Sequence, residues 1–321
     1  MANNNLTTAR KAKQDEFYTC RGDIEAELSH YAEHFRGKVV YCNCDDPSKS
    51  EFWKFFQRNF AEWGLKRLIA THYDPNEKNY SYMIEMKPGD SWNMEPVQVP
   101  IPCNGDFRSA ACIELLKQAD IVVTNPPFSL FREYIAQLLE YEKKFLIIGN
   151  MNAITYKEIF PLMRDNKLWY GVSITAGDRK FYVPDSYPLE AAGCGVDKET
   201  GRKYIRVKGV RWFTNLDHKK RHQPLDLRGN YYDSVKYPRF DNYDAINVGK
   251  YGEIPCDYNG IMGVPITFMD WYCPEQFEII GLSASWDETP MMQSLKLSEE
   301  NRHNPIINGR QIYRRIFVKR K

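Results

Sequence analysis

The stretch that decides the fold is Ile121-Val122-Val123-Thr124-Asn125-Pro126-Pro127-Phe128. The apolar run at its start predicts a buried strand. The two prolines end that strand abruptly, because proline has no backbone N–H and fixes φ at about −65°. A residue that precedes a proline is also pushed out of the helical region, so Asn125 and Pro126 should both be extended. We therefore expect a stiff loop that fixes a carboxamide at the end of a strand.

Two acceptors in this loop can hold the two hydrogens of a planar –NH₂ group. They are the side-chain oxygen of Asn125 and the backbone oxygen of Pro126, while Phe128 offers a ring that can stack on a heterocycle. Asn-Pro and Pro-Pro are also ordinary turn formers. The position before an amphipathic helix favours a ligand site, because open α/β sheets bind ligands at the carboxyl ends of their strands. The sequence thus predicts methylation of an exocyclic amine of a base by a catalytic loop of Asn125, Pro126, Pro127 and Phe128.

This chemistry requires no metal. A sulfonium methyl is already activated, so the enzyme mainly positions it in line with the amine. Asn125 would orient the amine and stabilise charge, since an amide cannot abstract a proton near neutral pH. His218 and His222 stand at i, i+4 spacing, but no cysteine or carboxylate cluster completes a metal site there.

Composition indicates a reduced, non-membrane protein. The 321 residues suit one large domain or two modest ones, and 43% hydrophobic residues allow a real core. The chain contains no run of about 18 apolar residues, so we expect no membrane span. The first residues do not have the apolar character of a signal segment. The eight cysteines are scattered without a CxxC pair. We expect free thiols and a cytoplasmic location.

Helical and strand patterns alternate through the first half of the chain. Four amphipathic helices are predicted at 23–36, 51–63, 109–118 and 129–142, and five strands at 39–42, 65–73, 121–124, 145–148 and 168–174. Capping boxes are predicted at Ser48–Glu51 and Thr155–Glu158. Such alternation predicts an α/β fold with a mostly parallel sheet between helices. It stops near residue 175, after which strand-like runs occur at 204–213, 264–268 and 277–282. We expect a flexible tail over 1–14, a catalytic domain over 15–175 and a β-rich, irregular region over 176–321.

Several polar or aromatic residues stand where the predicted strands end. Each also has a simpler structural interpretation, as a helix cap, a helix-dipole partner, an aromatic staple or a turn. As ligand contacts, Asp45 and Asp46 after the first strand could bind an amine-bearing ligand. Asp74 could bind ribose hydroxyls, and Asp106 and Phe107 could bind an adenine. The candidate ligand-binding residues are Phe17, Tyr18, Thr19, Asn43, Asp45, Asp46, Asp74, Asp106, Phe107 and Asn125.

Positive charge is local rather than global. The net charge is only +2, yet residues 201–222 contain eight lysines and arginines against Asp217 alone, and the carboxyl-terminal tail is also basic. Such patches neutralise nucleic-acid phosphates, although a solvated surface is the alternative. The candidate nucleic-acid contacts are Arg211, Asn215, His218, Lys219, Lys220, Arg221 and His222.

Several of these segments together resemble the EcoRI-type adenine-N6 DNA methyltransferases. They include Asp-Glu-Phe-Tyr-Thr (15–19), Tyr-Cys-Asn-Cys-Asp-Asp-Pro (41–47), Gly-Asp-Phe-Arg-Ser (105–109) and the stretches 115–132, 213–218, 244–248, 263–268 and 274–279. The resemblance covers nearly the whole chain. It implies a Rossmann-like doubly wound methyltransferase sheet, S-adenosylmethionine as cofactor, and an adenine flipped out of double-stranded DNA into the catalytic loop.

The resemblance also implies a division of labour and a biological setting. The β-rich, carboxyl-terminal part would read the DNA sequence, with GAATTC as the candidate site and a restriction endonuclease as a possible partner. The protein would work in the cytoplasm and associate with the nucleoid when bound to DNA. One departure stands out, because Asp46-Pro47-Ser48-Lys49-Ser50 replaces the glycine-rich cofactor loop of other amino-methyltransferases.

Three other functions would use similar residues. Cytosine-N4 methylation and methylation of a protein glutamine both present an –NH₂ group to such a loop. Cytosine enzymes usually have Ser where Asn125 stands, and a protein substrate would not need the basic second region. An inert DNA-binding relative is suggested only by the missing glycines, and the intact catalytic loop argues against it.

Overall fold

The chain forms two compact units. The computed structural model describes residues 17–44, 46–74, 79–189, 193–231, 235–297 and 303–321. The first unit comprises Met1–Met151 and Gly171–Leu216, and the second comprises Asn152–Tyr170 and Asp217–Lys321. Residues 176–216 thus group with the first unit, although the sequence pattern placed them in the second region, and Asn152–Tyr170 group with the second unit, although the pattern placed them in the first. The predicted functional boundary near residue 175 stays a prediction.

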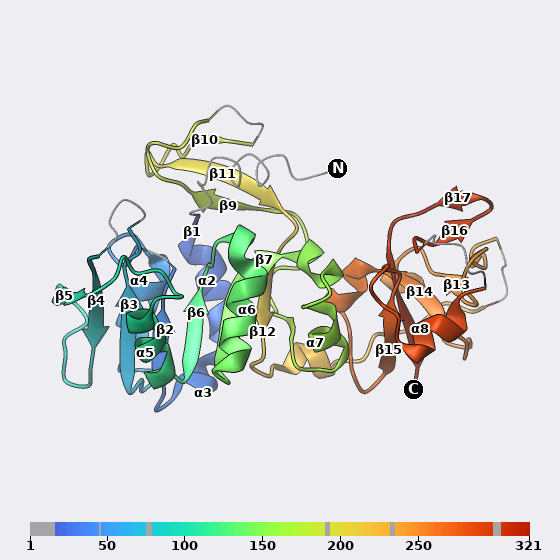
Figure 1. The fold of residues 1–321 in the computed structure, drawn as a ribbon, viewed down its shortest axis with the longest axis horizontal. Helices are drawn as coiled ribbons and strands as arrows, with labels where there is room; N and C mark the ends of the chain where they lie inside the picture. The colour runs from blue at the N-terminus through green and yellow to red at the C-terminus, as the bar shows by residue number, and fades with distance from the viewer. Residues whose placement is uncertain (1–16, 45, 75–78, 190–192, 232–234, 298–302) are drawn as a thin grey trace. The chain divides into compact units, whose positions relative to one another are not determined.

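Four parallel strands form the centre of the first unit. They are β3 (Arg67–Thr71), β2 (Val39–Cys42), β6 (Ile121–Thr124) and β7 (Lys144–Asn150), in that spatial order. Antiparallel strands extend the sheet on both sides: β4 (Ser81–Met86) and β5 (Val99–Ile101) beyond β3, and β12 (Val210–Thr214) beyond β7. The predicted α/β class is confirmed as a mixed sheet, with β6 near its middle (Figure 1).

Helices cover both faces of this sheet. Every residue of β2 and β6 is buried, which requires cover on each side. The helical segments are α2 (Arg21–Leu28), η1 (Ser29–Tyr31), α3 (Ala32–Phe35), α4 (Glu51–Asn59), α5 (Ala110–Gln118) and α6 (Phe131–Glu140). In Figure 1, α5 and α6 lie on the near face and α2 and α4 on the far one. The predicted apolar face of Ile24, Leu28, Tyr31 and Phe35 is fully buried, as expected.

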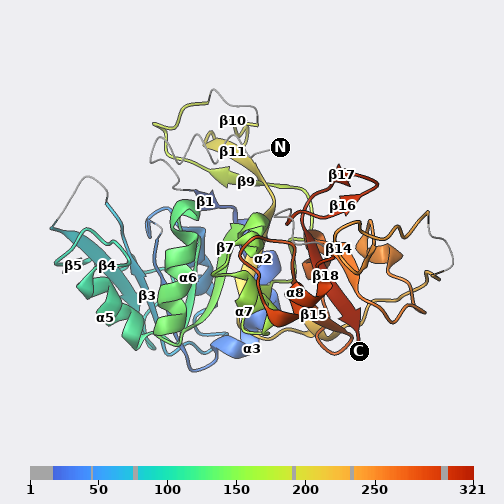
Figure 2. The same ribbon diagram turned by 45° about the vertical axis from the view of Figure 1, so that its right-hand side comes forward.

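A second, antiparallel sheet of the first unit joins segments far apart in the chain. Its order is β1 (Tyr18–Thr19), β9 (Asp178–Tyr182), β11 (Lys203–Lys208) and β10 (Gly195–Val196), as Figure 2 shows. The run predicted as one strand over 204–213 is wrong, because it divides between two sheets. Gly209 makes the break at φ +73°, a backbone conformation that glycine adopts without strain.

Both predicted capping boxes are wrong, although α4 begins at Glu51 as predicted. Ser50, rather than Ser48, caps α4, and its hydroxyl accepts from Trp53 N at 3.4 Å. Ser48 instead donates its hydroxyl to Asp46. The box at Thr155–Glu158 caps nothing, since the 3₁₀ segment η3 (Met151–Thr155) precedes α7 (Phe160–Arg164), which has no side-chain cap. The strand over 168–174 shrinks to β8 (Trp169–Tyr170).

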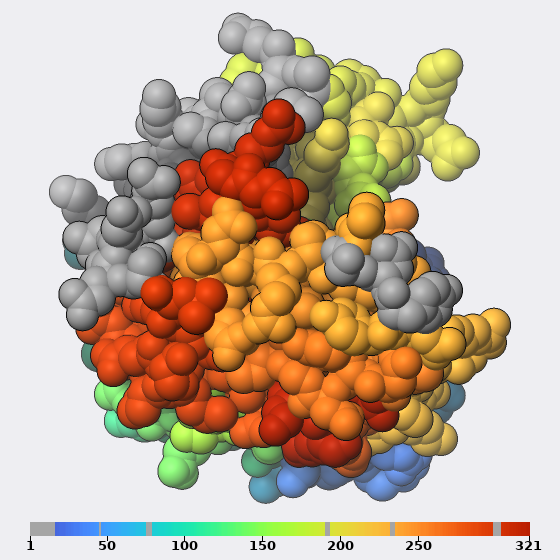
Figure 3. Space-filling model, turned by 90° about the vertical axis from the view of Figure 1, so that its right-hand side faces the viewer, coloured from blue at the N-terminus to red at the C-terminus, as the bar shows by residue number. Residues whose placement is uncertain are grey.

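The second unit is β-rich with short elements. Its main sheet has the order β13 (Ile246–Asn247), β14 (Met262–Pro265), β18 (Arg315–Arg320) and β15 (Phe277–Leu282), the last as predicted. A two-stranded sheet of β16 (Ile306–Ile307) and β17 (Arg310–Gln311), the helix α8 (Pro290–Leu295), and the 3₁₀ segments η4 (Lys219–His222), η5 (Tyr251–Glu253) and η6 (Ile266–Asp270) complete it. Figure 3 shows one face of this unit in orange and red. Among the described residues, no helix has the length and apolar character that a membrane crossing requires.

Candidate functional site

The catalytic loop leaves the carboxyl end of β6 in the centre of the first unit's sheet. Thr124 donates its hydroxyl to the Asn43 carbonyl at the end of the neighbouring strand β2. Leu130 N then donates to the Pro127 carbonyl at 2.9 Å, which closes the 3₁₀ segment η2 (Phe128–Leu130) directly before α6. The loop is therefore anchored on both sides, in agreement with the stiff loop that the two prolines led us to expect.

Asn125 holds a fixed side chain with one unused acceptor. The residue is only 6% exposed. Its amide nitrogen donates to the Phe17 carbonyl at 2.6 Å, and this bond fixes the amide so that Oδ1 is the free end. Among the described residues, buried Oδ1 accepts no hydrogen bond. A buried polar atom without a partner costs about 1–3 kcal/mol, so Oδ1 is a candidate acceptor for a hydrogen bond from a ligand.

Phe128 stands in a cluster of three rings from three segments. Its ring meets Phe17 edge to face at a centroid distance of 5.9 Å and Phe181 at 6.3 Å. Phe17 and Phe181 are buried, whereas Phe128 is half-buried. The two neighbours therefore hold the orientation of the Phe128 ring and leave part of it accessible.

The end of β2 supplies a structural amide and a carboxylate. Asn43 is buried, and its side-chain oxygen accepts from the Tyr134 hydroxyl. Asp46 accepts from Ser48 N at 3.0 Å and lies 3.7 Å from His72. Burial would raise the pKa of Asp46, but the Ser48 hydrogen bonds and the nearby His72 and Lys49 outweigh it and lower the pKa. Asp46 is thus held ionised, whereas Asp45 lies outside the described residues.

The loops that follow β3 and precede α5 are locked together. Asp74 N donates to the Asn104 carbonyl at 2.9 Å. Gly105 has φ +83°, and a Cβ there would lie 1.7 Å from the His72 carbonyl oxygen, so only glycine permits this approach. Asp74 and the segment of Asp106 and Phe107 are consequently brought to the same edge of the sheet as Asn125.

Asp106 and Phe107 already have protein partners. Hydrogen bonds from Arg108 lower the pKa of Asp106 despite its partial burial. Phe107 is 5% exposed, and its ring packs edge to face on Tyr134 at 4.9 Å. The Phe107 ring therefore has little free surface for stacking on a ligand.

Two predicted nucleic-acid contacts are built into the first unit. Arg211 is 3% exposed and donates to the Val210 carbonyl at 2.7 Å and the Thr175 carbonyl at 2.6 Å. Asn215 accepts from Phe145 N at 2.9 Å and donates to the Lys143 carbonyl at 2.9 Å. Both side chains thus hold backbone in place, and Arg211 presents almost no surface to a partner.

The other five predicted contacts form a basic turn, residues 218–222, in the second unit. His218 is buried, contacts the Tyr170 carbonyl at 2.9 Å through Nε2, and caps the turn by accepting from Arg221 N. The Arg221 guanidinium lies 3.7 Å from the centre of the Trp169 ring. These contacts orient both side chains inward.

The remaining cations of the basic turn differ in how they are held. His222 bridges Asp217 at 2.8 Å and Glu275 at 2.9 Å, and hydrogen bonds to these carboxylates raise its pKa. Lys220 lies 5.1 Å from the centre of the Trp271 ring. Lys219 is exposed, and the structure gives it no ion pair within the described part of the chain.

Some residues of the site were not identified from the sequence. His72 lies beside Asp46, and Tyr134 donates its hydroxyl to Asn43. The position of His72 directly after a predicted strand was the available signal. Tyr134 sits within α6 and gives no comparable signal. Within the described residues, no group of three His, Cys, Asp or Glu side chains could hold a metal.

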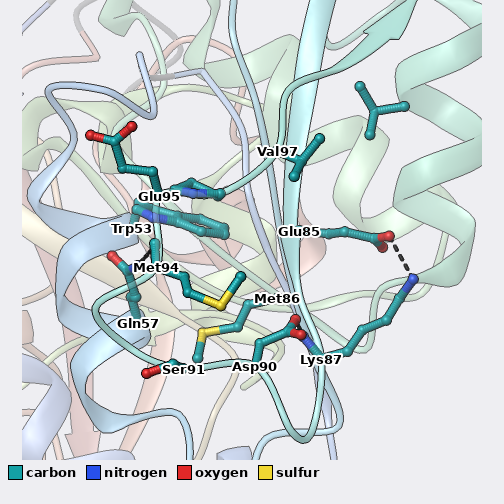
Figure 4. A pocket seen from close by; sticks show the side chains of 12 residues that line it. Trp53, Gln57, Glu85, Met86, Lys87, Asp90, Ser91, Met94, Glu95 and Val97 are labelled. Atoms are coloured by element: carbon teal, nitrogen blue, oxygen red, sulfur yellow. Dashed lines mark hydrogen bonds and ion pairs between the residues drawn. The ribbon is translucent and has the colours of Figure 1, made fainter.

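A separate cavity of about 270 Å³ lies between α4 and the β4–β5 hairpin. Figure 4 shows Trp53 from the helix facing Met86 and Met94 from the hairpin. None of the residues predicted for catalysis or cofactor binding lines this cavity. It is therefore distinct from the edge of the sheet where Asn125 lies.

Comparison with known proteins agrees with this geometry. The family described as adenine-specific methyltransferase EcoRI matches residues 5–321. The chain is 47% identical to the Type II methyltransferase M.EcoRI of Escherichia coli, over 98% of this chain and 96% of that protein. It is 41% identical to the Type II methyltransferase M.MpnI of Mycoplasma pneumoniae, over 98% and 97% of the two chains.

These matches define a class: the chain is an adenine-specific DNA methyltransferase, a transferase that uses a methyl donor. More particularly, it belongs to the EcoRI adenine-specific methyltransferase family, as the sequence resemblance predicted. The family decides between adenine and the cytosine and glutamine substrates that the sequence had left as alternatives.

Proposed function

We propose that this protein transfers a methyl group from S-adenosylmethionine to the N6 amine of an adenine flipped out of double-stranded DNA. The observation that carries the proposal is the fixed Asn125 amide, whose Oδ1 is buried and accepts nothing in the described structure. An adenine amine would donate to Oδ1 and to the Pro126 carbonyl, and Phe128 would stack on the ring. Extruding the base costs a few kcal/mol, which the stacking would partly offset.

We place the binding site of S-adenosylmethionine at the carboxyl ends of the central strands, as in a Rossmann-like methyltransferase. A second buried oxygen, Thr19 Oγ1, also lacks a hydrogen-bond partner among the described residues. Thr19 and Tyr18, with Asp46 and Asp74 after β2 and β3, would bind the donor, while Asn43, Phe107 and Asp106 would shape its walls. When bound, the donor supplies an activated sulfonium methyl. Asn125 orients the amine toward it, and the buried surroundings exclude water.

The DNA-binding proposal narrows to fewer residues. Lys219 and Lys220, on the outside of the basic turn, would contact phosphates directly. His218, Arg221 and His222 would instead hold the conformation of this turn. Arg211 and Asn215 would hold backbone within the first unit. The relatives are named Type II methyltransferases, which favours a modification partner for a restriction endonuclease, with GAATTC as the candidate site.

The decisive experiment is to express the chain in a methylation-free host and map modified bases by single-molecule sequencing. We expect N6-methyladenine within one short sequence, and none from the Asn125→Ala variant. Modified cytosine, or unmodified DNA from a folded protein that binds S-adenosylmethionine, would reject the proposal.

A further inference from the structure

A pocket of about 350 Å³ lies in the first unit beside β1. Three segments form it: Tyr18 on β1, the turn of Ser48 and Lys49 before α4, and a hairpin segment that contributes Asp185 and Arg202. The pairing of β1 with β9 brings the hairpin to the first strand, as Figure 2 shows. We call this site the β1 pocket.

Aromatic rings hold the cations of the β1 pocket. The Arg202 guanidinium lies 4.1 Å from the centre of the Tyr182 ring and 5.9 Å from that of Tyr18. Lys49 Nζ lies 5.9 Å from the Tyr18 ring centre. An arginine stacked on aromatic rings has a restricted orientation, and its N–H groups suit two oxygens of a phosphate.

The charges around the β1 pocket are unequally compensated. Lys49 pairs with Asp46 at 3.4 Å, and Lys54, which also lines the pocket, pairs with Glu51 at 2.8 Å. Arg202 forms no ion pair in the described part of the chain. Asp185 is the acid among the lining residues, and it is exposed. Arg202 is therefore the cation that a bound anion would neutralise.

The β1 pocket adjoins the proposed base site through the backbone. Tyr18 follows Phe17, whose carbonyl accepts the hydrogen bond that fixes Asn125. One peptide unit and one hydrogen bond thus connect a pocket wall to the catalytic amide. A nucleotide whose base reaches Asn125 brings its backbone phosphates with it.

We propose that the β1 pocket binds a DNA phosphodiester next to the flipped adenine, with Arg202 as the phosphate ligand and Lys49 beside it. This inference rests on the proposed function and adds a contact outside the basic turn. The methyl donor's carboxylate is the rival ligand. It is disfavoured because the donor also carries an ammonium and a sulfonium, which an uncompensated arginine would repel.

The test measures binding of the full-length chain to a labelled GAATTC duplex by fluorescence anisotropy at several salt concentrations. Arg202→Gln should weaken binding on the order of tenfold at low salt and reduce the salt slope by about one, the value for one lost phosphate contact. Affinity for S-adenosylmethionine, measured by calorimetry without DNA, should not change. Lys49→Gln should also reduce the salt slope, so the test remains decisive if Arg202→Gln fails to fold; only the slope is compared for this variant, because Lys49 pairs with Asp46 of the proposed donor site.

The matched control is Arg36→Gln, an exposed arginine that precedes β2 at the opposite edge of the sheet. It should keep the wild-type slope. An unchanged slope in both pocket variants would overturn the inference, as would weaker S-adenosylmethionine binding with an unchanged slope. Wild-type protein that forms no N6-methyladenine would instead count against the proposed function, so the two failures are distinguishable.

Discussion

The catalytic loop and the basic turn are both rich in polar groups, but they differ in how much bonding capacity is already used. In the loop, the side-chain nitrogen of Asn125 donates to the Phe17 carbonyl, and its side-chain oxygen accepts no hydrogen bond from the described residues. In the turn, His218, Arg221 and His222 have each found protein partners. The unmet acceptor of Asn125 supports the proposed ligand site, whereas the satisfied charges of the basic turn favour a structural role for these three residues. Residue type alone does not separate the two.

The strongest test of this contrast is Asn125→Ala. Removing the open acceptor should lower the single-turnover methylation rate by about 10²–10³-fold, the range for loss of one preorganised transition-state group. Binding of S-adenosylmethionine, measured by calorimetry, should stay near wild type. Asn59→Ala is the control, because its side-chain amide donates to the Phe55 carbonyl on α4 and Asn59 is not among the proposed site residues. Equal rates in wild type and Asn125→Ala would remove the catalytic assignment.

Phe128→Ala should have the next largest effect. Loss of base stacking is worth about 1–3 kcal/mol, so single-turnover methylation of a matched duplex should slow by roughly 5- to 150-fold. The deficit should shrink when the target adenine is mispaired, since a mispaired base is easier to extrude. A deficit of the same size on both substrates would place Phe128 in packing with Phe17 and Phe181 alone.

Lys219→Gln and Arg221→Gln should separate contact from scaffold within the basic turn. Lys219→Gln should reduce the salt slope of DNA binding by about one without changing the melting temperature. Arg221→Gln should lose its contact with Trp169, worth about 1 kcal/mol, and lower the melting temperature by about 2–4 °C. Calorimetric melting curves and anisotropy titrations decide this. If Arg221→Gln instead reduced the salt slope and Lys219→Gln lowered the melting temperature, Arg221 would be the phosphate contact and Lys219 the structural residue.

The smallest effect concerns pH. Asp217 and Glu275 raise the pKa of folded His222 above its unfolded value. The bridge therefore contributes fully below the unfolded pKa of about 6.5, and its contribution is lost as pH rises through the folded pKa. Wild type should exceed His222→Gln in melting temperature at about pH 5.5 and match it at about pH 9. A difference that is independent of pH would mean that the contacts of His222 are not ionic.

The sequence predicted the parts of the fold that depend on local periodicity. The strands at 39–42 and 121–124, the helix at 109–118 and the stiff loop at Asn125 all follow from such patterns. Long-range pairing was not predictable in this way. The local sequence of β12 does not show that this strand pairs with β7 instead of continuing β11. Nor does the sequence around Arg211 show that its guanidinium donates to two backbone carbonyls. The open oxygen of Asn125 likewise depends on Phe17, 108 residues away.

The placement of β12 has a consequence for synthesis and truncation. β7 ends at Asn150, but its antiparallel neighbour spans Val210–Thr214. A nascent chain that has reached residue 175 would still expose one edge of β7, and such an edge can pair with other chains. We expect fragments that stop there to aggregate, whereas those that extend past Leu216 include all the strands of this unit. A fragment meant to contain the whole first unit should therefore extend at least to Leu216, whereas a fragment that starts after Leu216 lacks Asn152–Tyr170 of the second unit.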